Sequence, residues 1–171
     1  MDFPHYLEKF KGAAGQLDRK LFDAKQIEIK TGIWLDSVVL KLQKKTWANS
    51  VQELFQPGPS IFFSVWLNDQ SIKESRLLYN IHALKLRQLK GYAIASRDFA
   101  TAFRKKFKKM ENKWPNVSTS FGPATLMEGW VPINEDAFQK DIPALANRFL
   151  EIEYLIDDVL DSFRKIPKGK N

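Results

Sequence analysis

The order in which two hydrophobic periodicities follow one another along the 171 residues limits the folds that this chain can adopt. Apolar residues recur every three or four positions over residues 4–22, 96–113 and 141–166, and this spacing predicts helices. Extended runs cover residues 26–35, 38–47, 61–67, 77–89 and 125–133. Consecutive strands followed by helices are typical of α+β domains. We therefore expect a two-layer sandwich, in which three main helices cover a mostly antiparallel sheet of about five strands, in the order α-β-β-β-β-α-β-α.

Several of these segments carry more specific signals. Asp36 and Ser37 separate the first two extended runs, as in a hairpin. Both alternating sets of residues in 61–67 are apolar, which predicts a strand buried on both faces. The run 77–89 changes parity in its second half, which favours a strand with a bulge and leaves a helix as the alternative. Ser96 is the expected N-cap of the helix over 96–113.

Composition and segment order predict one domain. No repeat, low-complexity tract or Ser/Gly linker divides the chain, so we expect a single globular domain over 1–166 and a loose polar tail over 167–171. The longest apolar runs, such as Ile61–Phe63, fall far short of the roughly 20 residues that span a bilayer. Because the chain has no cysteine and no signal-peptide pattern at its N-terminus, we expect a cytoplasmic protein that binds no membrane.

Clustered positive charge is the strongest functional signal. The formal net charge is +7, yet residues 85–113 alone hold ten lysine and arginine residues against Asp98 and Glu111. On the predicted helix, most of these cations lie opposite a stripe of phenylalanines. Such a row of cations can lie along a phosphate backbone, and Trp114 after the helix could stack on a base. The candidate nucleic-acid-binding residues are Lys85, Arg87, Arg97, Arg104, Lys105, Lys108, Lys109, Lys113 and Trp114.

A plainer interpretation of the same charges stays open. Every amphipathic helix needs a polar outer face, so the lysines could simply be solvated. Residues 134–161 carry eight acidic residues against Lys140 and Arg148, and this acidic segment could cover the basic helix. Among these alternatives, we expect a non-enzymatic binding module for nucleic-acid backbone.

A second hypothesis is a protein-interaction or assembly module. Apolar residues from Leu145 to Ile166 recur at alternating steps of four and three, which could form a coiled-coil seam with a protein partner or in a homodimer. Leu150, Leu155 and Leu160 make this stripe wider than a strict seam. A helix that packs on its own sheet is therefore the favoured interpretation.

A third hypothesis is a divergent metal-dependent nuclease. Glu28 and Lys30 lie two positions apart on a predicted strand and share a face, which is the arrangement that PD-(D/E)xK nucleases use. A metal-binding aspartate on a preceding strand is missing, because a helix is expected over residues 4–22, and Asp18 and Asp23 could supply a carboxylate only in a distorted version. We interpret His82, beside Asn80, as a hydrogen-bonded structural residue, and we expect no catalytic residues, no metal site and no cofactor.

Aromatic residues form a further pattern on the predicted strands. Phe62, Phe63, Trp66, Trp47 and Trp34 all fall there. On an open sheet face such rings could stack on single-stranded bases. Because their neighbours are apolar, we interpret all five as core residues.

Overall fold

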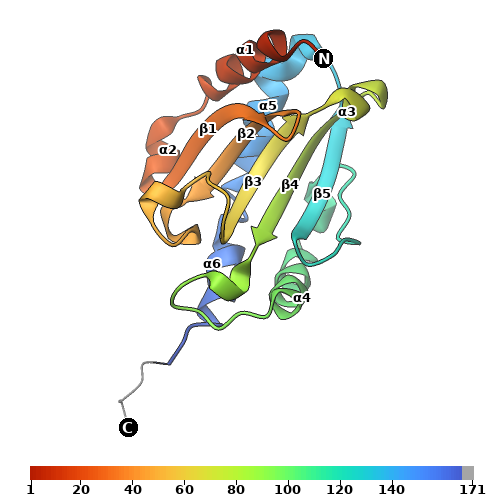
Figure 1. The fold of residues 1–171 in the computed structure, drawn as a ribbon. Helices are drawn as coiled ribbons and strands as arrows, with labels where there is room; N and C mark the ends of the chain where they lie inside the picture. The colour runs from red at the N-terminus through yellow and green to blue at the C-terminus, as the bar shows by residue number, and fades with distance from the viewer. Residues whose placement is uncertain (167–171) are drawn as a thin grey trace.

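Five antiparallel strands pair in the order in which they occur along the chain (Figure 1). The computed structural model describes residues 1–166, and the predicted tail over 167–171 lies outside them. The strands are β1 (Ile27–Trp34), β2 (Ser37–Lys44), β3 (Ser60–Leu67), β4 (Arg76–Leu84) and β5 (Thr125–Pro132). The predicted α+β class, strand order and antiparallel sheet are therefore confirmed.

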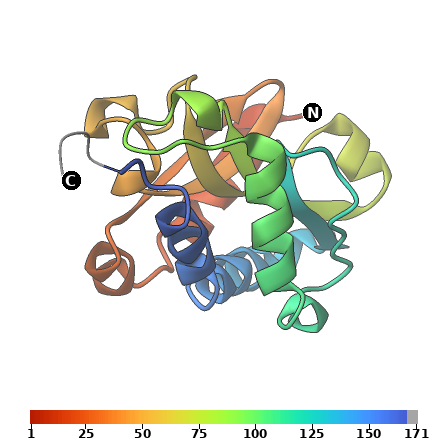
Figure 2. The same cartoon turned by 90° about the horizontal axis from the view of Figure 1, so that it is seen from below.

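The described helices, with one exception, pack on one face of this sheet. They are α1 (Phe3–Ala14), α2 (Arg19–Ala24), α3 (Asp69–Lys73), α4 (Ser96–Phe107), α5 (Phe138–Phe149) and α6 (Glu153–Asp161). The exception is the short α3, which lies in the connection between β3 and β4. Seen from below, α4, α5 and α6 lie together on the same side, and α4 runs beside α6 (Figure 2). The opposite face, which looks toward the viewer in Figure 1, has no helix over it.

Alternation along the strands decides which side chains meet the helices. In β2, Val38, Leu40 and Leu42 are fully buried under the helices, whereas Lys41 points to the other side. Phe63 of β3 also faces the helices, where its ring stacks on that of Phe149 in α5 with centroids 4.7 Å apart. One contiguous apolar core, which contains all of these residues except Lys41, joins the sheet to the helices.

The expectation that residues 61–67 are buried on both faces is wrong. Phe62 and Trp66 point away from the helices and are only half-buried, because no described helix covers that face of β3. The bulge expected in 77–89 lies on the partner strand instead, since Ile81 pairs with Met127 and His82 with Thr125, which leaves Leu126 of β5 as the extra residue. Strand β4 ends sooner than expected, at Leu84, and a 3-10 turn follows at Leu86–Gln88.

Each of the three predicted helices is shorter than the periodicity indicates. The segment 4–22 is divided into α1 and α2, because the Asp18 side chain accepts a hydrogen bond from the Lys20 amide and starts a new helix. The segment 141–166 is divided into α5 and α6 by a turn at residues 150–152. The segment 96–113 is helical only to Phe107, and its N-cap is Ala95 rather than Ser96.

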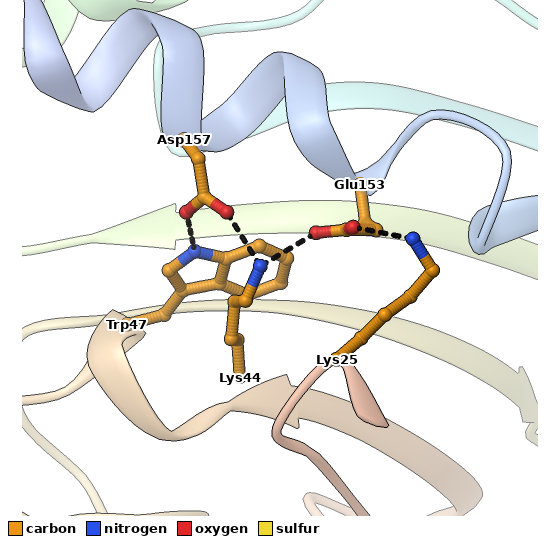
Figure 3. A network of polar contacts seen from close by, with 5 residues as sticks. All are labelled: Lys25, Lys44, Trp47, Glu153 and Asp157. Atoms are coloured by element: carbon orange, nitrogen blue, oxygen red, sulfur yellow. Dashed lines mark hydrogen bonds and ion pairs between the residues drawn. The ribbon is translucent and has the colours of Figure 1, made fainter. Parts of the chain in front are cut away.

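A network of charges attaches α6 to the first hairpin of the sheet (Figure 3). Glu153 is 3% exposed and accepts from Lys25 Nζ at 3.0 Å and from Lys44 Nζ at 2.9 Å. Asp157 accepts a second contact from Lys44 and a hydrogen bond from Trp47 Nε1 at 2.8 Å. Both carboxylates of α6 are thus matched by donors from the sheet side.

The same network changes the acidity of Lys44. Burial on its own lowers the pKa of this ammonium, but hydrogen bonds and charge from Asp157 and Glu153 outweigh burial and raise it. Lys44 therefore stays charged throughout the neutral range, and its contribution to stability is lost only as the pH rises through this elevated pKa.

Removal of Lys44 tests how firmly the network holds α6. In Lys44→Met, the buried Glu153 keeps only Lys25, so the free energy of unfolding should fall by about 1.5–3 kcal/mol, as for a lost hydrogen bond to a charged group. Lys45→Met, which removes an exposed pair with Glu28 at 3.5 Å, should change it by less than about 1 kcal/mol. Urea unfolding of both variants measures the difference, and equal effects would contradict an anchoring role.

Candidate nucleic-acid interface

Helix α4 turns its phenylalanines inward and its cations outward. Phe99, Phe103 and Phe107 follow one another at four-residue steps and are fully buried in the core. The side chains on the opposite side of the helix and in the following turn are exposed. We call these exposed cations the α4 basic face: Arg97, Lys105, Lys106, Lys108, Lys109 and Lys113.

The acidic helix does not neutralise the α4 basic face. Although α6 runs beside α4, no ion pair joins the two among residues 1–166. Glu153 and Asp157 face the hairpin and pair with Lys25 and Lys44. Asp161, four residues after Asp157, pairs with Arg164 and is not part of that network. The positive potential over α4 is therefore not cancelled by salt bridges of the described chain.

A groove of about 410 Å³ lies where α4 and α6 meet. Lysines of the α4 basic face form one wall, and Tyr154 of α6, which is 43% exposed, belongs to the other. The groove is lined by Lys105, Lys106, Lys109, Met110, Tyr154 and Leu155. Tyr154 and Lys106 are not among the candidates that the sequence predicts. Both residues lie beside a predicted apolar stripe, and this position is the signal that could have placed them at the border between the two helices.

The remaining exposed candidates lie elsewhere. Lys85 and Arg87 are exposed on the segment between β4 and α4, and neither lines the groove. Lys85 instead borders a separate hollow of about 320 Å³ together with Pro57 and Ser96. The structure thus brings together the lysines of α4 but not the whole predicted set.

Two predicted binding residues have structural roles instead. Trp114 is 3% exposed and packs against the rings of Tyr79 and Phe63, so its faces are not open to a base. The half-buried guanidinium of Arg104 donates to the carbonyl oxygens of Leu126, Phe121, Gly122 and Thr125 at 2.9–3.1 Å. It ties α4 to the start of β5. Neither side chain belongs to the α4 basic face.

The five aromatic residues singled out on the strands fall into two groups. Phe63 and Trp47 are fully buried in the core, as expected. Trp34, Phe62 and Trp66 are half-buried on the sheet face that the helices leave uncovered, so the expectation that they are core is wrong. Position along each strand decides this outcome, because every second side chain points away from the helices.

Polar residues on the same face form a hydrogen-bonded chain. Ser64 Oγ donates to Asn80 Oδ1, and Asn80 Nδ2 donates to Glu128 Oε1 at 3.2 Å and to His82 Nε2 at 3.1 Å. Because Nε2 accepts, the proton of neutral His82 must lie on Nδ1, which faces the carbonyl oxygen of Ala124 at 3.3 Å. The structural interpretation of His82 agrees with this geometry.

Burial shifts the titration of three groups on the uncovered face. It lowers the pKa of His82, an effect to which the charge of Lys41 adds and which the bond to Ala124 partly offsets. Burial also raises the pKa of Glu128, against the hydrogen bond from Asn80. Burial, with the charge of Lys30, lowers the pKa of Lys41 to about 8. Each shift disfavours the charged form, as partial desolvation predicts.

The nuclease and coiled-coil hypotheses gain no support from these positions. Glu28 and Lys30 do share a face, but Glu28 pairs with Lys45, and within residues 1–166 no three His, Asp or Glu side chains gather as a cation site. The apolar stripe from Leu145 through Val159 is buried in the chain's own core, as the favoured interpretation predicted. None of the described helices is long and apolar enough to cross a bilayer.

No protein-family model, curated protein or solved structure matches this chain. Its function is therefore argued from its own residues.

A substitution of Arg104 separates its structural role from the binding surface beside it. In Arg104→Gln, most of the contacts to four carbonyl oxygens are lost, and the free energy of unfolding should fall by about 1.5–3 kcal/mol. Lys105→Gln, at the next and exposed position, should change it by less than about 0.5 kcal/mol. Thermal unfolding followed by circular dichroism compares the two, and a smaller loss in Arg104→Gln would contradict the role.

The hydrogen-bonded chain around His82 predicts a loss of stability in acid. Because the folded pKa of His82 lies below its ordinary value, its contribution is present above about pH 6.5 and is lost as the pH falls. A second proton would point Nε2 at the amide group of Asn80, donor against donor. NMR titration should give a pKa below about 6.5 for His82, with His5→Gln assigning the two histidine signals. A value above this would contradict the assignment.

Proposed function

We propose that this protein binds the sugar–phosphate backbone of nucleic acid through the α4 basic face. The observation that carries the proposal is the distribution of ion pairs. Glu153 and Asp157 of α6 pair with Lys25 and Lys44, and no carboxylate of α6 pairs with the exposed cations of α4 among the described residues. The exposed Asp158 is the carboxylate of α6 that has no ion pair in the described chain.

The chemistry of the α4 basic face favours backbone contacts over base reading. Five of its six cations are lysines, which approach phosphates as mobile point charges, and each contact releases condensed counterions. Bidentate reading of a base edge needs arginine or amide side chains, and the groove between α4 and α6 has none. We therefore expect binding that depends weakly on base sequence and strongly on salt.

Tyr154 gives the groove an additional contact. Its exposed ring stands opposite lysines of α4 across the groove, so a backbone held by those lysines would place a sugar or a base beside the ring. The lining offers cations and apolar surface rather than a nucleophile beside a base. The arrangement supports a binding module and not a catalytic site.

Charge reversal on α4 tests the proposal. Fluorescence anisotropy of a labelled duplex should show binding that weakens roughly 100-fold between about 50 and 200 mM salt, as for about four phosphate contacts. The triple variant Lys105→Glu, Lys108→Glu and Lys109→Glu should bind too weakly to measure at the higher salt, with a salt slope smaller by about 2.7.

A matched control separates the surface from the overall charge. Lys20→Glu, Lys73→Glu and Lys140→Glu make the same change in net charge at exposed positions on α2, α3 and α5. This second triple variant should keep most of the affinity and the full salt slope. Equal losses in both variants, or no binding by the wild type at the lower salt, would refute the α4 basic face as the site.

A further inference from the structure

The sheet face without helices carries aromatic rings on three of its strands. Trp34 lies at the end of β1, Phe62 and Trp66 lie on β3, and Trp130 lies on β5, all half-buried. At about 4.8 Å between neighbouring strands, the set extends over roughly 19 Å from β1 to β5. We call Trp34, Phe62, Trp66 and Trp130 the sheet-face rings.

Cations lie among these rings without carboxylate partners. Lys41 Nζ lies 4.1 Å from the ring centroid of Trp34 and 4.6 Å from that of Phe62. The Arg76 guanidinium lies 4.4 Å from the ring centroid of Trp130. Neither cation has an ion pair with a carboxylate among the described residues. Cation–π contacts hold them in place but leave their charge unneutralised.

The acidic residues of this face do not cancel that charge. Glu28 pairs with Lys45 near the edge of the sheet. Glu128 accepts from Asn80, and its burial favours the protonated form. Lys30 repels Lys41 across the same surface. A half-buried, unpaired ammonium between two rings is costly in the free protein, and an anion that arrives with its own flat ring would relieve that cost.

We propose that the uncovered sheet face is a second binding site, which takes single-stranded nucleic acid by stacking bases on the sheet-face rings. Phosphates between successive bases then meet Lys41, Lys30 and Arg76, the cations interleaved with the rings. Duplex nucleic acid is excluded because its bases are already stacked and turned inward. The site stands independently of the α4 basic face, since α4 lies on the opposite side of the sheet (Figures 1 and 2).

Tryptophan fluorescence reports on this site directly. Trp34, Trp66 and Trp130 are sheet-face rings, whereas Trp47 and Trp114 are buried in the core at 0% and 3% exposure. The protein used is the Lys105→Glu, Lys108→Glu, Lys109→Glu variant, so that binding at α4 does not contribute. An unlabelled oligothymidylate of about 12 nucleotides should quench the fluorescence, and a duplex of equal length should not.

Substitutions on the same background locate the contacts. Phe62→Ala should weaken oligothymidylate binding roughly 5- to 150-fold, as for one lost base stack. Phe62→Leu keeps apolar volume without a ring and should weaken it in the same direction even if the alanine variant unfolds. Lys41→Met should weaken binding and reduce the salt slope by about 0.7. Phe121→Ala, an exposed ring on the loop before β5, is the matched control and should change nothing.

The outcomes distinguish this site from the one on α4. If the wild type binds both strands and the α4 variant shows no quenching, the sheet-face site is refuted and the proposed function stands. If the wild type does not bind duplex and the α4 variant still binds the single strand, the sheet-face site is supported and the α4 basic face is refuted. Quenching that thymidine monophosphate reproduces at equal affinity, or that follows self-association of the protein, would refute single-stranded nucleic acid as the occupant.

Discussion

Side chains alternate between the two faces of a β-sheet, and here the helices satisfy only one face. The burial of Leu40 and Phe63 beneath the helices fixes the register of the hairpins, since a slip by one residue would put Lys41 into the core. Once that register is set, the side chains of Phe62 and Trp66 must lie on the sheet face that the helices leave uncovered. Both surfaces proposed for binding follow from this asymmetry: one lies on the layer of helices, and the other on the sheet they leave open.

The ion pairs of α6 determine which charges remain exposed. Glu153 and Asp157 contact Lys25, Lys44 and Trp47. These two carboxylates therefore face the first hairpin and the segments that flank it. Arg104 has the matching role for α4, because its guanidinium serves backbone carbonyls before β5 instead of solvent. Two of the four carboxylates of α6 are thus paired on the sheet side rather than with α4. The positive surface is a consequence of where these partners lie, and not of net charge alone.

Periodicity predicted the fold because the strands and helices are strongly patterned. The order of the main elements and the antiparallel sheet could be derived from apolar spacing, whereas the bulge lies on β5 and not on the run for which it was expected. Helix ends could not, because the break at Asp18 depends on one side-chain cap and the apolar stripe runs unchanged through the break at residues 150–152. Apolar spacing continues through such breaks and gives no sign of them.

The candidate site was predictable only in part, for a related reason. Outward-facing lysines such as Lys105 and Lys109 follow from helical geometry. The roles of Arg104 and Trp114 do not, since Arg104 contacts the loop before β5 and Trp114 packs on rings of β3 and β4. Likewise, an apolar ring on a strand looks the same in sequence whether its face is covered or open. Phe62 and Phe63 are neighbours and identical in type, and only the location of the helices separates them.

The two surfaces differ in a way that bears on what each can recognise. Lysines of the α4 basic face stand on flexible exposed stems, so they can follow a backbone of any geometry without selecting among strands. Lys41 is confined between two rings and partly desolvated, so its charge acts from a nearly fixed position. A fixed cation beside rigid rings favours a ligand whose bases and phosphates are spaced like the rings and the ammonium group. We therefore expect affinity without discrimination from the α4 basic face, and discrimination between single strand and duplex from the uncovered sheet face.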